Sequence, residues 1–349
     1  MSDLAKWKVH GQVRSVKTSF AEWDLAAEEW RGPQYHNEAT FRPDGKLDET
    51  RHFNPDGTIA RTKNLYDDRD LLIETQFWKD DSLQNQALYT YDGARRHVRT
   101  VSLTHDGKER EAETSTYDSR GRKTTVRFLY PPEGAGQISY WIEAADQGFS
   151  VPGAVAMTTI YDPNDLAAEV LFHDAQNAVV GRVVLTRDES GRLVKAEFQM
   201  GDRPPFPEAA AQGEKAGLPT DELLAKVFGP SRSFSRTTYS YDEHGLLVER
   251  ATEMGLLSGE RSAFRYDPHG NPIDESTAQE DREFEADEQG ELHVTKERSH
   301  TRHTRFQYQY DKQGNWTERV LWGRLEPNAN FERANVERRE ITYHVRASR

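Results

Sequence analysis

Histidines and carboxylates in the second half of the chain are the side chains whose types could support metal or acid–base chemistry. His300 and His303 lie three residues apart in the segment "SHTRH". On a helix this spacing would place two metal ligands on one face, whereas on a strand it places them on opposite faces. The surrounding sequence favours a strand, so we predict no metal site at these histidines.

Carboxylates are densest in "AQEDREFEADEQGE", from Ala278 to Glu291. No motif holds two of them as a fixed pair, so we interpret this run as an exposed acidic sheet edge that discourages aggregation. The sequence contains no Gly-rich phosphate loop, no nucleophile elbow and no His-Glu-x-x-His motif. It also has no cysteine, which excludes disulfides, thiol nucleophiles and zinc–thiolate sites. We therefore predict a protein that is not an enzyme and holds no cofactor or metal; a hydrolase using His244, His269 and nearby acids is an alternative.

The tryptophans are better candidates for a binding site. Trp23 and Trp30 lie in "FAEWDLAAEEWRG", and Trp141 and Trp322 also lie outside the regular aromatic pattern described below. An indole ring is large, rigid and amphipathic, so an exposed one can stack on a sugar ring or anchor a partner protein. The alternative role for these four residues is to cap the ends of the apolar core.

A repeated motif indicates the elements that position these side chains. The motif is an aromatic residue, then Asp or Asn, two variable residues and Gly. A type I turn favours Asp or Asn at its first position and Gly at its fourth, where φ is positive. Each copy is therefore typical of a hairpin tip. The clearest copies contain Tyr117, Asp118 and Gly121; Tyr161 and Asp162; Tyr241, Asp242 and Gly245; Tyr266, Asp267 and Gly270; and Tyr310, Asp311 and Gly314.

Hairpins of this kind predict a cross-strand register. The aromatic residue before Asp should face the second residue after Gly, so Tyr241 should lie opposite Leu247, and Tyr310 opposite Trp316. Aromatic residues alternate further back along each strand, as in Tyr308 and Tyr310, with the period of two that a strand requires. The motif tyrosines and aspartates are thus interpreted as structural.

The fold class that follows is all-β. We predict repeated antiparallel hairpins that form one long, curled or spiral sheet, an open shell or barrel-like, as a single domain over residues 1–349. Two insertions interrupt the pattern: an irregular Gly- and Ala-rich stretch at 131–156, and residues 201–233. The second contains a predicted short helix near 220–228, with Thr220 as its N-cap and Gly229 just past its end.

With these motifs the chain resembles the YD-repeat, or RHS-repeat, family, over roughly residues 38 to 345. "VHGQVRSVKTSF", from Val9 to Phe20, also resembles the first strand of small bacterial members. The resemblance implies a long antiparallel β-strip that winds into a spiral shell. In large members the shell encloses a toxin domain, and a C-terminal region cuts the chain. We expect neither here, because the sequence has no Asp-Pro-x-Gly cap and no toxin domain after "REITYHVRASR".

The net charge of −13 disfavours nucleic acid and anionic membranes as partners. No window approaches a membrane span, and the N-terminus has no apolar signal core. We expect a cytoplasmic protein as the chain is written, or a secreted or cell-envelope protein if a signal peptide has been removed. We also expect a monomer, because charges at 337–340 guard the last strand. The leading functional hypothesis is a non-enzymatic scaffold that binds a protein partner, and the alternative is a carbohydrate-binding module.

Overall fold

The computed structural model describes residues 3–129, 137–142, 147–200, 233–286, 292–324 and 330–344. These residues form 22 strands and one four-residue helix, α1 (Asp3–Lys6). Every strand pair with a defined register is antiparallel, and most are hairpins of consecutive strands. The predicted all-β class built from antiparallel hairpins is therefore confirmed. The helix predicted near 220–228 lies outside the described residues.

The chain divides into two compact units. Unit 1 contains Met1–Ala112, Tyr266–Asp274 and His303–Arg349, and unit 2 contains Glu113–Arg265 and Glu275–Arg302. No helix in the described part of either unit is long and apolar enough to cross a membrane.

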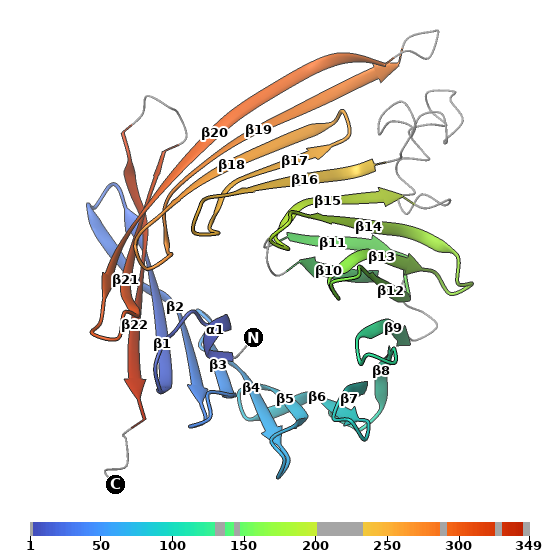
Figure 1. The fold of residues 1–349 in the computed structure, drawn as a ribbon. Coiled ribbons are helices and arrows are strands. Elements are labelled where there is room, and N and C mark those ends of the chain that lie inside the picture. Colours follow the sequence, from blue (N-terminus) through green and yellow to red (C-terminus); the bar gives the residue numbers. More distant parts are fainter. Residues whose placement is uncertain are drawn as a thin grey trace. The chain divides into compact units, whose positions relative to one another are not determined.

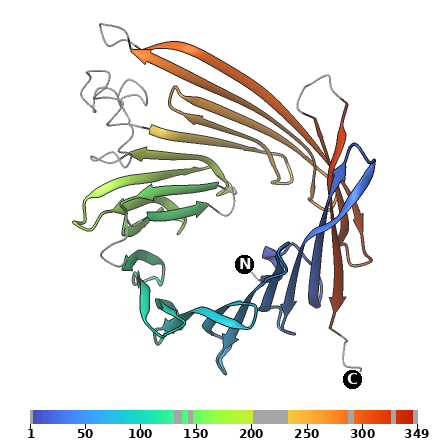
Figure 2. The same cartoon turned by 180° about the vertical axis from the view of Figure 1, so that it is seen from behind.

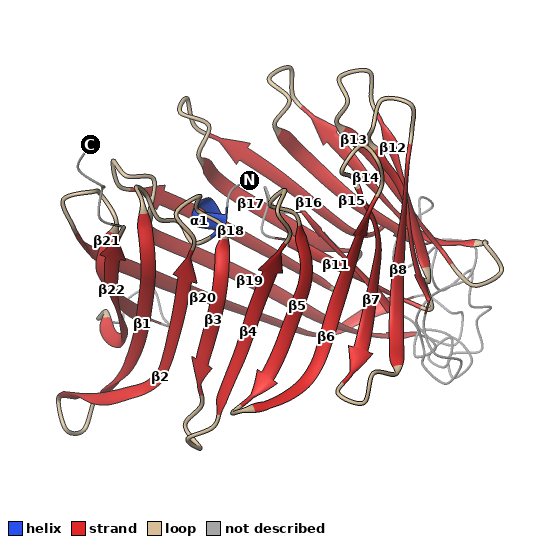
Figure 3. Cartoon of the chain, turned by 90° about the horizontal axis from the view of Figure 1, so that it is seen from below, coloured by secondary structure: helices blue, strands red, loops and turns tan. Residues whose placement is uncertain are grey.

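Unit 1 is one antiparallel sheet. It contains tryptophans from both the N-terminal and the C-terminal parts of the sequence. Its strands pair in the order β20–β21–β22–β1–β2–β3–β4–β5–β6–β7, and Figure 3 shows β1 to β7 side by side. Only the part of β20 from His303 onward belongs to this unit. The strands are β1 (Val13–Asp24), β2 (Glu29–Phe41), β3 (Leu47–Phe53), β4 (Ile59–Tyr66), β5 (Leu72–Lys79), β6 (Ser82–Tyr91), β7 (His97–Thr104), β20 (Leu292–Tyr310), β21 (Trp316–Arg324) and β22 (Glu332–Tyr343).

Unit 2 contains a second antiparallel series, with pairing order β9–β12–β13–β14–β15–β16–β17–β18. Two further strands, β10 and β11, pair only with each other. The strands are β8 (Glu109–Tyr117), β9 (Lys123–Leu129), β10 (Gln137–Ile142), β11 (Gln147–Pro152), β12 (Ala156–Tyr161), β13 (Ala167–His173), β14 (Val179–Arg187), β15 (Leu193–Met200), β16 (Ser233–Tyr241), β17 (Leu247–Met254), β18 (Ser258–Tyr266) and β19 (Pro272–Ala286). The first residues of β8, up to Ala112, the last residue of β18 and the first residues of β19, up to Asp274, fall in unit 1.

The repeated motif forms the same turn at each copy. At Asp242 the backbone N–H bonds to the carbonyl of Leu246, and the N–H of Gly245 bonds to the carbonyl of Asp242. Asp242 Oδ1 also accepts the backbone N–H groups of His244 and Leu246, at 2.9 and 2.8 Å. Gly245 has a φ of 80°, which a residue with a Cβ adopts only with strain. The same contacts recur at Asp118, Asp188, Asp267 and Asp311.

The predicted register is confirmed. Tyr241 lies opposite Leu247, and Tyr310 lies opposite Trp316, each at a bulge in its hairpin. The structure adds a contact between repeats: the hydroxyl of Tyr241 donates to the carbonyl of Leu193, 2.8 Å away and one hairpin earlier. The hydroxyl of Tyr161 likewise donates to the carbonyl of Lys123 at 2.7 Å. The motif tyrosine therefore joins successive hairpins as well as closing its own.

The largest core lies in unit 2, where the β10–β11 hairpin covers one face of the sheet. Figures 1 and 2 show this hairpin lying over β13 and β14. Ile138 and Val151 face each other across it and are buried against Phe172 and Phe198 of the sheet. The Gly/Ala-rich composition of 131–156 predicted irregular backbone; its described part is instead a regular hairpin, because every second residue is apolar and finds a face to cover.

The aspartates of the turns predict how stability depends on pH. Backbone N–H donation from Arg122 and Arg192 lowers the pKa of Asp118 and Asp188 below the usual value. A carboxyl whose pKa is lower in the folded state contributes stability above its unfolded pKa and loses it as pH falls. We therefore expect the melting temperature of the wild type to drop more between about pH 5 and pH 3 than that of the Asp118→Asn/Asp188→Asn variant.

Circular dichroism at a series of pH values measures this difference. Asp81→Asn, which removes an exposed carboxyl outside the repeat turns, is the control and should follow the wild type. Parallel curves for wild type and the double variant would contradict the assignment.

Candidate binding groove

Three of the four tryptophans predicted as binding residues come together in unit 1. Trp23 of β1 and Trp30 of β2 are paired across their hairpin, with ring centroids 5.0 Å apart and planes at 73°. Trp322 of β21 joins them through Arg333 of β22, whose guanidinium lies 4.8 Å from the ring centroid of Trp23 and 5.1 Å from that of Trp322. The fourth, Trp141, lies in β10 of unit 2, and its side chain is outside the described residues.

Local sequence features place these rings. The turn after β1 is held by Asp24, whose Oδ1 accepts the N–H groups of Ala26 and Ala27 and whose Oδ2 binds Arg31 at 2.8 Å. Bulges shift the register after Phe20 in β1 and before Trp322 in β21. A bulge redirects the side chains beyond it, and the second one places Trp322 directly opposite Arg333.

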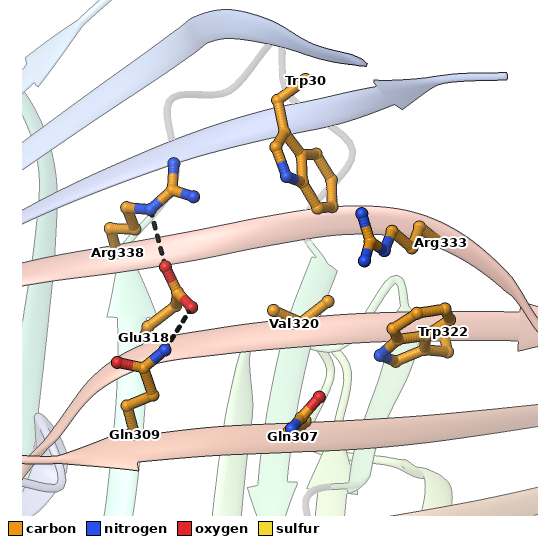
Figure 4. A pocket seen from close by; sticks show the side chains of 8 residues that line it. All are labelled: Trp30, Gln307, Gln309, Glu318, Val320, Trp322, Arg333 and Arg338. Atoms are coloured by element: carbon orange, nitrogen blue, oxygen red, sulfur yellow. Dashed lines mark hydrogen bonds and ion pairs between the residues drawn. The ribbon is translucent and has the colours of Figure 1, made fainter. Parts of the chain in front are cut away.

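A groove of about 250 Å³ runs beside this cluster (Figure 4). At one end lie Arg333 and Trp322, and Trp30 and Val320 lie near the middle. At the other end Glu318 accepts a hydrogen bond from Gln309 at 2.8 Å and one from Arg338 at 2.8 Å. The remaining lining residue is Gln307, whose side chain makes no hydrogen bond to a described residue. The groove thus combines indole surface with amide, carboxylate and guanidinium groups.

The groove lies on the sheet face opposite the one that carries Tyr308, Tyr310 and Trp316, which we call the ladder face. Gln307 and Gln309 alternate along β20 with Tyr308 and Tyr310, and alternate residues of a strand point to opposite faces. On the ladder face Tyr308 packs against Trp316, with ring centroids 6.2 Å apart. The two faces of this part of unit 1 are therefore chemically distinct.

The ladder face contains a separate cluster of charged residues, whose opposite charges partly neutralise one another. Glu337 is only 5% exposed and is paired with Arg319. Arg339 lies over the ring of Trp316, at 3.5 Å from its centroid, and burial lowers the pKa of its guanidinium to about 10. Arg339 still carries its charge at neutral pH. We interpret the cluster as a buried ion pair that positions β21 against β22.

The histidines and motif aspartates lie outside the groove lining. The motif aspartates are committed to backbone N–H groups of their turns, as described above. His244 is exposed at its hairpin tip, 3.6 Å from Glu243, and His269 stacks on Tyr310 with ring centroids 4.2 Å apart. His300 and His303 both lie in β20. Within the described ranges, no three or more His, Asp or Glu side chains gather as metal ligands.

Sequence reasoning did not identify the polar lining of the groove. Gln307 and Gln309 carry a usable signal, because they alternate with the aromatic residues of "FQYQYD" and so must share the opposite face. The sequence gives no such signal for Arg333, because its neighbours Trp23 and Trp322 come from strands that meet it only in the folded sheet.

No family model matches the chain, and no curated protein does. Among solved structures, it is similar to a porin-like protein from Bacteroides uniformis, at 9% identity and a TM-score of 0.34, over 96% of this chain and 100% of that one. A porin-like protein from Bacteroides vulgatus is 10% identical, with a TM-score of 0.26, over 95% of this chain and 98% of that one. A TcdB2-TccC3-TEV structure is 13% identical, with a TM-score of 0.17, over 86% of this chain but 19% of that one. At these identities and TM-scores the likenesses carry no argument about what this chain does.

Proposed function

We propose that this protein is a non-enzymatic β-repeat scaffold whose tryptophan-lined groove binds a saccharide. The observation that carries the proposal is the convergence of Trp23, Trp30 and Trp322 beside a groove lined by amide and charged groups. A sugar ring presents an apolar C–H face and a rim of hydroxyl groups. Indole rings suit the face, and planar polar side chains suit the rim.

The polar residues of the groove support this ligand class. Glu318 is already held by Gln309 and Arg338, so its position is set before any ligand arrives. Preorganised polar groups fix the orientation of a ligand at little entropic cost. Gln307 offers both an amide donor and an acceptor that a hydroxyl group can use.

A protein partner is the second candidate, and a different observation favours it. Leu25, at the tip of the hairpin that holds Trp23 and Trp30, is 62% exposed. Tryptophan and arginine are also enriched in the few residues that dominate protein–protein affinity. A partner that covers the tip as well as the groove would bury Leu25, whereas a saccharide confined to the groove would not.

The recurrent turn geometry supports a further proposal, that the chain is a small member of the YD-repeat family it resembles. The Asp-centred hydrogen bonds and the positive φ of the glycine recur at five or more copies, so the motif acts as one structural unit throughout. No cargo is proposed on this basis.

The experiment is a glycan array with the purified chain, followed by tryptophan fluorescence titration of any oligosaccharide retained. We expect at least one oligosaccharide to bind and to change the emission of the groove tryptophans. The proposal fails if no glycan is retained. A protein retained from the cell envelope fraction, with loss of binding in Leu25→Asp but not in a Leu256→Asp control, would establish the second candidate instead; Leu256 is 45% exposed and lies in unit 2.

A further inference from the structure

The tryptophan end of the groove carries an excess of cationic side chains. Arg333 lies between the rings of Trp23 and Trp322. Nearby on the neighbouring strands, Arg305 and Arg324 both lie over the ring of Phe331, at 4.0 and 4.6 Å from its centroid. Arg305 is the register partner of Trp322, so the three guanidinium groups belong to adjoining strands of one sheet.

Few carboxylates lie close enough to these arginines to neutralise their charge. Arg305 has Asp274 at 3.5 Å, but no carboxylate of a described residue lies within 4.0 Å of Arg324 or Arg333. The Nε of Arg324 is buried and has no hydrogen-bond partner among the described residues. The chain has a net charge of −13, and many of its other arginines form ion pairs with carboxylates. Arg338, for example, is paired with Glu318.

Aromatic contacts leave a guanidinium group able to bind an anion. A ring in contact with a guanidinium carbon does not itself accept all of the N–H groups of that guanidinium, so some of them remain available to a ligand. A guanidinium edge forms two parallel hydrogen bonds with a carboxylate or a sulfate. An anion would also satisfy donors that are otherwise partly desolvated, which makes the site selective for negative charge.

We infer that this end of the groove binds the anionic group of an acidic saccharide. The ligand class is a carboxylated or sulfated oligosaccharide, with its sugar ring on the indole surface and its anionic group at Arg333. The inference rests on the proposed function and deepens it by naming the charge of the ligand.

The test compares three oligosaccharides of one length: a neutral one, one containing a uronate, and one carrying a sulfate ester. Binding is measured by titration to the wild type, to Arg333→Gln and to Arg282→Gln. Arg282 is a partly exposed arginine of unit 2 that pairs with Glu297 and Glu280, so its variant removes the same charge at a residue that does not line the groove. Near-UV circular dichroism shows whether each variant keeps its packing.

We expect the wild type to bind one acidic oligosaccharide about tenfold or more tightly than the neutral one, and we expect this preference to shrink as salt is raised. Arg333→Gln should lose most of the preference for the acidic oligosaccharide over the neutral one, and Arg282→Gln should match the wild type. Whichever acidic oligosaccharide is preferred identifies a carboxylate or a sulfate as the recognised group.

The failures of the two proposals are distinguishable. Equal binding of neutral and acidic oligosaccharides, unchanged in Arg333→Gln, overturns the inference and leaves saccharide binding in place. Equal losses in Arg333→Gln and Arg282→Gln show a nonspecific charge effect and also overturn the inference. Absence of binding to all three oligosaccharides in the wild type, together with an empty glycan array, overturns both.

Discussion

Trp30→Ala is expected to weaken saccharide binding by about tenfold or more, because truncation of a central aromatic residue in a binding site commonly costs about 2 kcal/mol. Trp30 is the best of the three tryptophans for this test. Its ring lines the groove and packs edge-on against Trp23. Trp23 and Trp322 also hold Arg333, so their removal would change the charge distribution as well as the stacking surface.

Two controls separate loss of stacking from loss of structure. Trp30→Phe keeps a ring in the same place and should retain much of the affinity. Phe77→Ala removes a 38% exposed aromatic residue from β5 in the same unit and should leave binding unchanged. Wild-type affinity in Trp30→Ala would show that the groove is not the binding site.

Phe172→Ala should give the largest loss of stability, about 3–5 kcal/mol in the free energy of unfolding. Phe172 is fully buried in unit 2 and contacts the rings of Tyr140 and Phe198, at 6.3 and 6.5 Å between centroids. Removing its ring leaves a cavity between the sheet and the β10–β11 hairpin. The surrounding strands cannot close this cavity without breaking their hydrogen bonds, so most of the cost persists.

Urea unfolding followed by fluorescence measures this loss. Ile160→Ala is the matched control, because Ile160 lies on β12 of the same unit but is 43% exposed, and its truncation should change stability by less than about 0.5 kcal/mol. A loss below about 1 kcal/mol in Phe172→Ala would mean that β10 and β11 do not form a packed layer on this sheet.

The features that sequence reasoning predicted correctly are those set within a few residues. An Asp that can accept the N–H groups two and four residues later, followed by a Gly that adopts a positive φ, specifies the turn at Asp242 and Gly245 without help from the rest of the chain. This turn also specifies the register of the two strands that it joins, so the pairing of Tyr241 with Leu247 was predictable. The alternation of aromatic and polar residues then determined the all-β class.

Three of the tryptophans singled out from the sequence come together in the structure, but the sequence alone does not show that they do. Trp23 and Trp30 are close in sequence, and their pairing follows from one hairpin. Trp322 and Arg333 reach the same place only because β22 pairs with β1, and because two bulges adjust the direction of the side chains. No local pattern encodes a pairing between strands some 300 residues apart.

By itself, then, the amino-acid sequence determined the hairpins, their turns and the alternation of faces, because these depend on hydrogen bonds and steric preferences over about five residues. Only the tertiary structure decided which hairpins adjoin, that β10 and β11 cover the core of unit 2, and that Arg333 meets Trp23 and Trp322 beside one groove. These outcomes depend on pairing and burial between distant segments, where the free energy of a contact depends on what the rest of the chain places beside it.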